Sequence, residues 1–487
     1  MKNELAFAFV ATCLSAEPSL AQRAELVLAG GRVMDPETGL DAIRNVGIAA
    51  GSIVAVSEAP LEGNEVLDVR GLVVAPGFID LHAHGQDPVS NRLQAQDGVT
   101  TALEMEIGVY PVGAWLASRE DTAPIHFGAT VSHVGARAKL MHDVDLGSWA
   151  MLPPDSTFSL EHRDFAYAEA SDSRLDELKT LMVRGLEEGG LGFGLGITYT
   201  PGASREEILA LFELAAKNGV PIYVHTRGEG SGGTLGAFQE VIADAAVTGA
   251  SLHIVHMNSS AGESARTTLA MIRGARERGL DVTTEAYPYT AGSTRLESAL
   301  FDSWEERSDE DYANLQWTAT GERLTSKTFE IYREEGGWVI IHGGRTEETN
   351  AWIVAQPDVM VASDGIPFLY GPAHPRGAGT FARILGHYSR ERDVIGLMPA
   401  LAKMTFLPAR RLEDAAPVMK KKGRVQEGMD ADLTIFNPET VLDRSSYEDG
   451  DVPSTGIAHV LVSGTFVVRD GELVADALPG RAIRGER

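Results

Sequence analysis

The sequence is almost free of cysteine. Cys13 is the single one in 487 residues, so no disulfide bond can form within the chain. No apolar run reaches 18 residues, which excludes a membrane-spanning helix. Basic residues are scarce too: 42 Lys and Arg stand against 69 Asp and Glu, and the formal net charge is −27. This charge argues against nucleic acids and anionic membrane surfaces as partners.

The rest of the composition is typical of a globular protein, with 44% hydrophobic and 23% charged residues. The length suits one large domain with a satellite, or two to three domains. Residues 1–21 have the pattern of a secretory signal peptide: Lys2, an apolar run to Ala16, and a small-x-small cleavage site at Ser19-Leu20-Ala21. A short N-terminal helix is the alternative. We expect export, and therefore a secreted, periplasmic protein.

The two ends of the chain have the same pattern. Residues 22–75 and 412–487 contain short strand-like runs separated by turns, and we predict that they form one small β-sandwich together. In residues 76–411, strand-like runs alternate with helical ones. This alternation favours the α/β class and a (β/α)8 TIM-like barrel, in which chemistry sits at the carboxyl ends of the strands. Residues 297–337 are charged and irregular, and we expect them to be an insertion beside the barrel.

Hydrophobic pattern and turn residues predict the individual elements. The predicted helices are Leu175–Glu188, Ser204–Asn218, Glu263–Gly279 and Val394–Met404. The predicted barrel strands are Val99–Met105, Ile125–Val131, Leu191–Ile197, Pro221–His225, Ser251–His256, Val282–Ala286, Trp338–His342 and Val359–Ser363.

The most informative stretch is the apolar run that begins at Val73 and ends in His82 and His84. Side chains alternate along a strand, so these two histidines point the same way. Two imidazoles at a strand end can hold one metal ion at about 2.0–2.1 Å each. An isolated His-x-His is more often a pair of ordinary polar residues, but further polar side chains follow at other strand ends.

His225, His256 and Asp364 each follow a strand-like run. Alone, a strand-end histidine is more often structural and an Asp-Gly pair is more often a turn. Together with His82 and His84 they favour a metal site, in which a cation lowers the pKa of bound water and Asp364 carries the proton. His253 lies three residues before His256, faces away on a regular strand, and is interpreted as structural.

Several motifs resemble those of the amidohydrolase superfamily, and within it the N-acyl-D-amino-acid deacylase family, over nearly all of residues 24–487. Pro76-Gly77-Phe78-Ile79-Asp80-Leu81-His82-Ala83-His84 is highly specific to the superfamily. The deacylase branch is indicated by Tyr287-Pro288-Tyr289-Thr290-Ala291-Gly292-Ser293-Thr294 and by His374-Pro375-Arg376. Further matches are Gly98-Val99-Thr100-Thr101, Gly192–Tyr199, His225-Thr226-Arg227 and Ala362-Ser363-Asp364-Gly365.

The resemblance implies the roles of individual residues. Zinc, one ion or two, is held by His82, His84, His225 and His256, and Asp364 is the catalytic acid and base. Arg376 binds the substrate α-carboxylate, with a plain salt bridge as the alternative. The same pocket is expected to include Tyr287, Ser293 and Arg295, and Arg227 is expected to orient a ligand or the substrate.

The chain departs from the family pattern at two places. After Gly-Val-Thr-Thr the family usually places a cysteine metal ligand, whereas this chain has Glu104 and Glu106 on one strand face. A carboxylate can replace the thiolate or bridge two ions, and we predict Glu106, with Glu104 as the fallback. A buried glutamate paired with a cation is the alternative. Second, Asn258 stands where the family commonly has a lysine, so one positive group for the substrate is missing.

These observations predict a zinc-dependent enzyme that hydrolyses a linear amide in a small molecule, an N-acyl-D-amino acid or a dipeptide that ends in a D-residue. A cyclic amidohydrolase of the dihydroorotase or hydantoinase kind is the enzyme alternative. A non-catalytic periplasmic binding protein is the alternative of another class, and Asp364 argues against it because a binder needs no proton shuttle. The sequence leaves the oligomeric state open, a homo-oligomer included.

Overall fold

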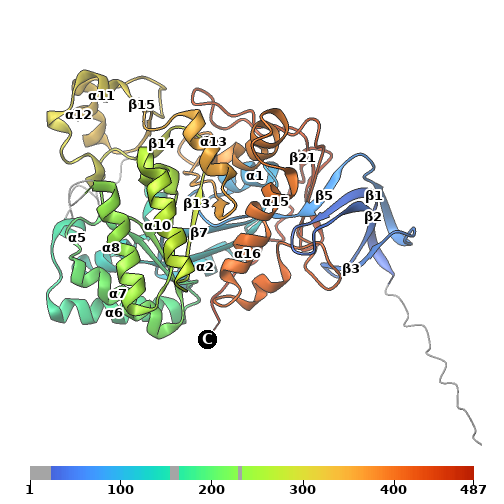
Figure 1. The fold of residues 1–487 in the computed structure, drawn as a ribbon, viewed down its shortest axis with the longest axis horizontal. Coiled ribbons are helices and arrows are strands. Elements are labelled where there is room, and N and C mark those ends of the chain that lie inside the picture. The colour runs from blue at the N-terminus through green and yellow to red at the C-terminus, as the bar shows by residue number, and fades with distance from the viewer. Residues whose placement is uncertain (1–22, 154–163, 229–232, 487) are drawn as a thin grey trace, which may run out of the picture.

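The computed structural model describes residues 23–153, 164–228 and 233–486. The predicted signal peptide, residues 1–21, lies outside them. A barrel surrounded by helices forms one part of the molecule, and a sheet built from both chain ends stands beside it (Figure 1). In the described part of the chain, no helix combines the length and the apolar character needed to cross a bilayer.

Eight parallel strands form the barrel, as predicted. Their order is β17-β13-β12-β11-β10-β8-β7-β6, and the ends approach each other where Ala83 pairs with Gly365. The strands are β6 (Phe78–Asp80), β7 (Val99–Tyr110), β8 (His126–Ser132), β10 (Phe193–Gly196), β11 (Pro221–His225), β12 (Ser251–Ile254), β13 (Val282–Ala286) and β17 (Val359–Val361). The short β9 (Gly147–Ser148) pairs with β7.

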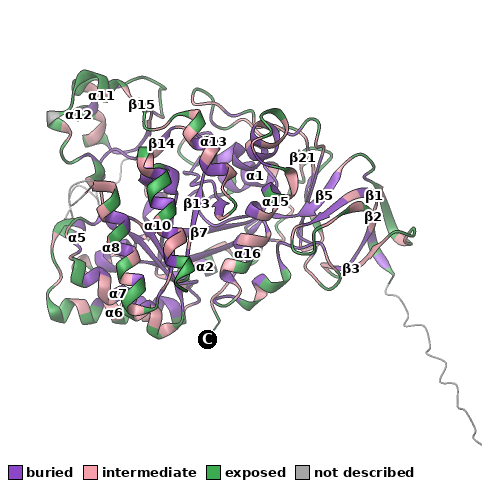
Figure 2. Ribbon diagram, in the orientation of Figure 1, coloured by how far each residue is buried: buried purple, intermediate pink, exposed green. Residues whose placement is uncertain are grey.

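Helices cover the outside of the barrel, so both faces of its strands are buried (Figure 2). The four predicted helices are present with ends shifted by up to three residues. The helices are α1 (Pro88–Gln96), α2 (Val112–Arg119), α3 (His133–His142), α5 (Asp164–Tyr167), α6 (Asp172–Glu187), α7 (Arg205–Asn218), α8 (Gly233–Thr248), α9 (Met257–Ala261), α10 (Ala265–Glu277), α13 (Glu347–Ala355), α14 (Arg376–Arg383), α15 (Leu397–Met404) and α16 (Phe406–Leu412).

One predicted barrel strand is wrong. Trp338–His342 contains β16 (Trp338–Ile341), which belongs to a separate three-stranded sheet with β14 (Gly292–Arg295) and β15 (Leu315–Trp317). The missing barrel strand is β6, which lies inside the run that carries the histidines. The runs that contain β6 and β16 have similar apolar patterns, and such a short pattern does not reveal which sheet a strand joins.

The three-stranded sheet and two helices, α11 (Asp309–Ala313) and α12 (Ser326–Glu335), form a small unit. Along the chain this unit follows β13 and precedes α13. Its core is largely aromatic: the rings of Trp304 and Phe329 stack 5.5 Å apart, and those of Trp317 and Tyr332 stack 4.6 Å apart. The segment predicted as irregular therefore has its own hydrophobic core.

We predicted that both chain ends form one small β-sandwich, and in the structure both ends contribute strands to one nine-stranded sheet. β5 connects the two contributions, because it pairs with β1 on one side and β18 on the other. The strands are β1 (Ala24–Asp35), β2 (Leu40–Ala49), β3 (Ser52–Ser57), β4 (Gly63–Asp68), β5 (Val73–Pro76), β18 (Leu433–Phe436), β19 (Ile457–Val462), β20 (Thr465–Arg469) and β21 (Glu472–Leu473). The run that starts at Val73 thus enters this sheet first and the barrel second.

Candidate metal centre

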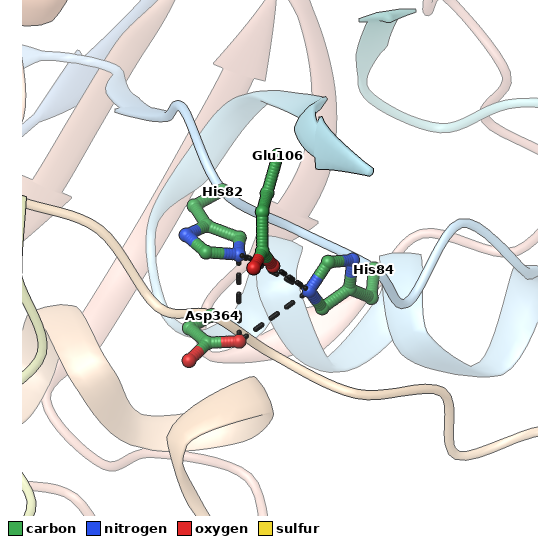
Figure 3. A group of neighbouring side chains, drawn as sticks. All are labelled: His82, His84, Glu106 and Asp364. Atoms are coloured by element: carbon green, nitrogen blue, oxygen red, sulfur yellow. Dashed lines mark hydrogen bonds and ion pairs between the residues drawn. The ribbon is translucent and has the colours of Figure 1, made fainter. Parts of the chain in front are cut away.

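Four buried side chains from three places in the sequence converge at the carboxyl end of the barrel strands (Figure 3). His82 and His84 follow β6, Glu106 belongs to β7, and Asp364 follows β17. Glu106 Oε2 lies 2.7 Å from His82 Nε2 and 2.9 Å from His84 Nε2. Asp364 Oδ1 lies 3.4 Å from both of these nitrogens.

The second oxygen of Glu106 meets a second pair of histidines. Its Oε1 lies 2.5 Å from His225 Nδ1 and 3.3 Å from His256 Nε2, and these two nitrogens are 3.0 Å apart. Each oxygen of one carboxylate therefore faces its own pair of imidazole nitrogens. A carboxylate in this position is able to bridge two cations, which in two-metal sites lie about 3.5–4 Å apart.

An irregularity in β7 sets the position of Glu106. The pairing of β7 with β8 shifts register between Glu104 and Val109, where Gly108 has φ +67°. Such a bulge re-aims side chains next to active sites. The neighbouring β10 approaches the bulge closely at Gly194: a Cβ there would lie 2.6 Å from the carbonyl oxygen of Glu106. The glycine of the 192–199 motif is thus required by this approach.

Carboxylates behind the histidines fix which nitrogen faces the centre. His82 Nδ1 lies 2.6 Å from Glu285 Oε1, and His84 Nδ1 lies 2.7 Å from Glu104 Oε2. Because a carboxylate accepts, each Nδ1 carries a proton, and Nε2 is the nitrogen that each ring directs toward the centre. Glu104, the fallback ligand, therefore supports His84 from behind, and Glu106 occupies the centre.

The backbone is strained at two of the candidate residues. His256 has φ +29° and Asp364 has φ +51°, values that L-residues adopt at a cost. Asp364 is held by its neighbour: Ser363 donates its N–H to Asp80 at 3.0 Å and its hydroxyl to the other oxygen of Asp80. Burial raises the pKa of Asp80 to about 6. These two hydrogen bonds connect β6 to the segment after β17, and so join the first and last strands of the barrel next to the cluster.

The cluster favours positive charge at its centre. Although burial favours neutral imidazole, the carboxylates of Asp364 and Glu106 raise the pKa of His82 well above its ordinary value. Burial also opposes a charged Glu106, yet the surrounding histidines lower the pKa of Glu106 well below its usual range. Four imidazoles with carboxylates are the donors that divalent cations such as zinc bind in hydrolases, so the residues fit a metal ion.

Arg376 lies beside the cluster. Its Nη2 is 2.8 Å from Asp364 Oδ1 and donates to the Ser293 carbonyl at 3.3 Å, and its guanidinium lies 4.6 Å from the Tyr287 ring centroid. Among the described residues, none offers a hydrogen-bond acceptor to its buried Nε and Nη1. Although burial opposes the charged form, Arg376 and His82 lower the pKa of Asp364. The salt bridge weighed as an alternative exists, but it leaves two nitrogens free.

The other predicted pocket residues lie further from the cluster. Arg295 is bound by Glu297 and by the carbonyl of Leu152 at 2.8 Å, and Arg227 is bound by Glu240 at 2.9 Å. The Ser293 hydroxyl donates to the Val339 carbonyl at 2.8 Å. None of these side-chain contacts involves the cluster, whereas the Tyr287 ring and the Ser293 carbonyl are connected to it through Arg376.

The sequence analysis assigned no role to three residues that lie near the site. Glu285, on β13, supports His82 and also lies 3.1 Å from His253 Nε2, so His253 belongs to the supporting network. The Tyr199 ring lies 5.0 Å from the His225 ring; burial, together with the charge of Glu106, raises the pKa of Tyr199 well above its ordinary value. Arg345 donates to the Tyr287 hydroxyl at 2.8 Å. A carboxylate at a barrel strand end was the available signal for Glu285.

The comparisons with known proteins agree with this geometry. An amidohydrolase family model matches residues 73–272. The N-acyl-D-glutamate deacylase of Alcaligenes xylosoxydans xylosoxydans is 30% identical, covering 96% of this chain and 97% of the relative. The D-aminoacylase of the same organism is 30% identical, covering 92% and 95%.

The fold is shared with a solved structure. The N-acyl-D-glutamate deacylase of Bordetella bronchiseptica, complexed with zinc and a phosphonate mimic of the tetrahedral intermediate, has a TM-score of 0.79 at 27% identity, covering 95% of this chain and 100% of the other. Similar to these deacylases over nearly its whole length, the chain belongs to the amidohydrolase superfamily and, within it, to the N-acyl-D-amino-acid deacylase family.

Proposed function

We propose that the protein is a zinc-dependent enzyme that deacylates N-acyl-D-amino acids. The observation that carries the proposal is the position of Asp364, between a buried set of metal donors and an arginine with two nitrogens that have no partner in the described parts of the chain. The relatives named as N-acyl-D-amino-acid deacylases support the substrate class.

Zinc would be held by His82, His84, His225 and His256 with Glu106 between the pairs. When bound, zinc supplies Lewis-acid polarisation of the amide carbonyl and lowers the pKa of water. The protein's own residues orient the imidazoles, carry the proton and bind the substrate. Glu285 and Glu104 hold the first two imidazoles in the tautomer that presents Nε2.

Asp364 is the proton carrier in this proposal. Its Oδ1 accepts a proton from the water whose oxygen forms the new bond to the amide carbon. The same carboxyl group then gives this proton to the amine nitrogen as the C–N bond breaks. The products are a carboxylate and a free amino acid, so no further reactant is needed.

Arg376 fixes the substrate. Its Nε and Nη1 are free to donate to the α-carboxylate, while Nη2 stays with Asp364. A guanidinium suits this role because its donors lie in one plane and its charge persists at any physiological pH. The carboxylate is thereby placed next to the proton carrier.

A substrate panel tests the proposal. Purified zinc-loaded protein is mixed with N-acetyl-D-amino acids, their L-enantiomers, D-terminal dipeptides and cyclic substrates such as dihydroorotate and hydantoin. We expect release of free amine from the N-acetyl-D series. Ring opening without amine release would assign a cyclic amidohydrolase, and turnover of no substrate with tight binding of one would assign a binding protein.

We further propose that the protein is exported. The support is the sequence of residues 1–21. Mass spectrometry of protein from its native host should show a mature start near Gln22. An intact Met1 in a cytoplasmic fraction would contradict export.

A further inference from the structure

Tyr287 lies against two arginines. Its side chain is fully buried, and its ring centroid is 4.6 Å from the Arg376 guanidinium carbon and 5.2 Å from that of Arg345. Arg345 Nη2 also donates to the Tyr287 hydroxyl at 2.8 Å. Arg345 lies between β16 and α13, far along the chain from both other residues, and the fold brings it beside the candidate site.

Arg345 has no carboxylate within salt-bridge distance in the parts of the chain that the structure describes. This distinguishes it from the other arginines around the site, because Arg376 meets Asp364 and Arg295 meets Glu297. Arg345 is half-buried, and no described residue offers an acceptor to its buried Nε. A partly desolvated guanidinium with open donors is costly unless an anion completes it.

Asn258 also contacts Tyr287, and its side chain carries no charge. Its amide donates to the Tyr287 carbonyl at 2.9 Å and to Asn350 at 3.0 Å. Arg345 and Arg376 are the two arginines that lie over the Tyr287 ring in the described structure, and of these Arg376 is paired with Asp364.

One carboxylate does not need both arginines. Arg376 offers two unpartnered nitrogens, which is enough hydrogen-bonding capacity for the α-carboxylate. Asp364 already lies against Arg376, so Arg345 is the cation beside Tyr287 that lacks a counter-charge in the described structure. A substrate with a second carboxylate would supply both the acceptor and the negative charge that Arg345 lacks.

We infer that Arg345 binds a side-chain carboxylate of the substrate, so that the preferred substrates are N-acyl amino acids with acidic side chains. This inference rests on the proposed function, and it names a specificity-determining residue of the same site. Arg295 is not available for this role, since Glu297 and the Leu152 carbonyl already occupy it.

The test compares kcat/KM for paired substrates, N-acetyl-D-glutamate against N-acetyl-D-glutamine and N-acetyl-D-aspartate against N-acetyl-D-asparagine. The wild type should prefer each acid. Arg345→Gln should lower kcat/KM for the acids by about 10-fold or more, mainly through KM, and change the amides less than about 3-fold. Arg345→Lys should keep part of the preference for acids, because it restores the charge.

Arg174→Gln, an exposed arginine on α6, is the matched control and should change nothing. An equal loss for acids and amides in Arg345→Gln, or a wild type that prefers the amides, would overturn the inference while leaving deacylation intact. If the wild type releases amine from no N-acyl amino acid, the proposed function fails first, and this inference falls with it.

Discussion

At the scale of single residues, Glu106 links the two halves of the candidate metal centre. Its two oxygens face separate pairs of histidines, so one side chain connects all four imidazoles. A cysteine has one sulfur in the same place and the same charge when ionised. The carboxylate adds a second donor atom, and Asp364 faces the pair that Oε2 serves.

Asp364→Asn removes the proton carrier and keeps the size of the side chain. We expect kcat to fall by about 10²–10⁴, the usual loss when general acid–base catalysis is removed. Stopped amine-release assays on zinc-loaded protein measure this, and metal analysis checks that zinc is still bound. Near-normal turnover would show that Asp364 does not carry the proton.

Arg376→Lys keeps a positive charge but loses the planar set of donors. We expect kcat/KM to fall about 10-fold or more for substrates with a free α-carboxylate, because a charge-assisted hydrogen bond is lost. For the corresponding α-amides the fall should be much smaller. An equal loss for both series would mean that Arg376 serves mainly to hold Asp364 in place.

The sequence predicted which polar side chains lie together at the strand ends, and it predicted less about their surroundings. His82, His84, His225, His256 and Asp364 meet as expected, since a barrel brings strand ends together. The sequence did not predict the ion pair between Arg295 and Glu297, because side-chain packing determines which arginine remains available to a substrate. Arg345 was missed for the same reason: it lies in a connection whose path follows from the small three-stranded sheet.

At the scale of elements, the bulge of β7 and the close approach of β10 form one unit. Thr130 belongs to it as well, since its hydroxyl donates to the Met105 carbonyl at 2.9 Å. A bulge cannot be inferred from alternation alone, because an extra residue shifts the faces of everything after it. The β16 segment could not be assigned from its sequence, since its apolar pattern suits a barrel strand and a strand of a separate small sheet equally.

Gly194→Ala tests this unit. The new Cβ would lie 2.4 Å from the Thr130 hydroxyl and 2.6 Å from the Glu106 carbonyl oxygen, so β10 and the bulge must separate. We expect the free energy of unfolding to fall by about 1–3 kcal/mol, as in overpacked cores, and metal affinity to weaken. Denaturant unfolding and zinc titration measure the two effects.

The matched control is Gly274→Ala in the interior of α10, where the nearest atom to a new Cβ is the flexible end of Arg278 at 3.3 Å. This change should raise the free energy of unfolding by about 0.5–1 kcal/mol, because alanine is the better helix former. If Gly194→Ala matched it in stability and in metal affinity, the close approach of β10 would not matter.

At the scale of the whole molecule, a buried ionic cluster joins the terminal sheet to the barrel. Asp432 lies 2.5 Å from Lys422 Nζ and 3.2 Å from His126 Nε2, and it accepts from the Ser463 N–H at 2.7 Å. His126 begins β8, so the carboxylate connects the sheet to the barrel end opposite the candidate metal centre. The fold as a whole was predictable because its two alternating patterns differ along the chain, whereas this contact was not.

Asp432→Asn should therefore destabilise the protein. Removing one partner of a buried ion pair costs about 3–5 kcal/mol, which urea unfolding at pH 7 measures. Burial opposes the charged form, but Lys422 and His126 lower the pKa of Asp432, so its contribution is complete above the unfolded pKa of about 3.9 and is lost as the pH falls below it.

The difference between wild type and Asp432→Asn should accordingly shrink below about pH 4. Asp68→Asn, which removes an exposed partner of Arg70, is the control and should have little effect at either pH. A difference that stays constant from pH 7 to pH 3 would mean that the charge of Asp432 does not link the two parts.

The most direct measurement of the central claim is a zinc titration of chelator-treated protein, followed by amine release from N-acetyl-D-amino acids and by metal analysis. We expect the metal-free wild type to be inactive and to recover as zinc binds. Glu106→Gln should bind zinc about 10-fold or more weakly and recover little activity, while Glu104→Gln, which keeps an oxygen acceptor for His84 Nδ1, should weaken zinc binding less and lower stability. Full zinc content and full activity in Glu106→Gln, or unchanged activity in metal-free wild type, would contradict the account.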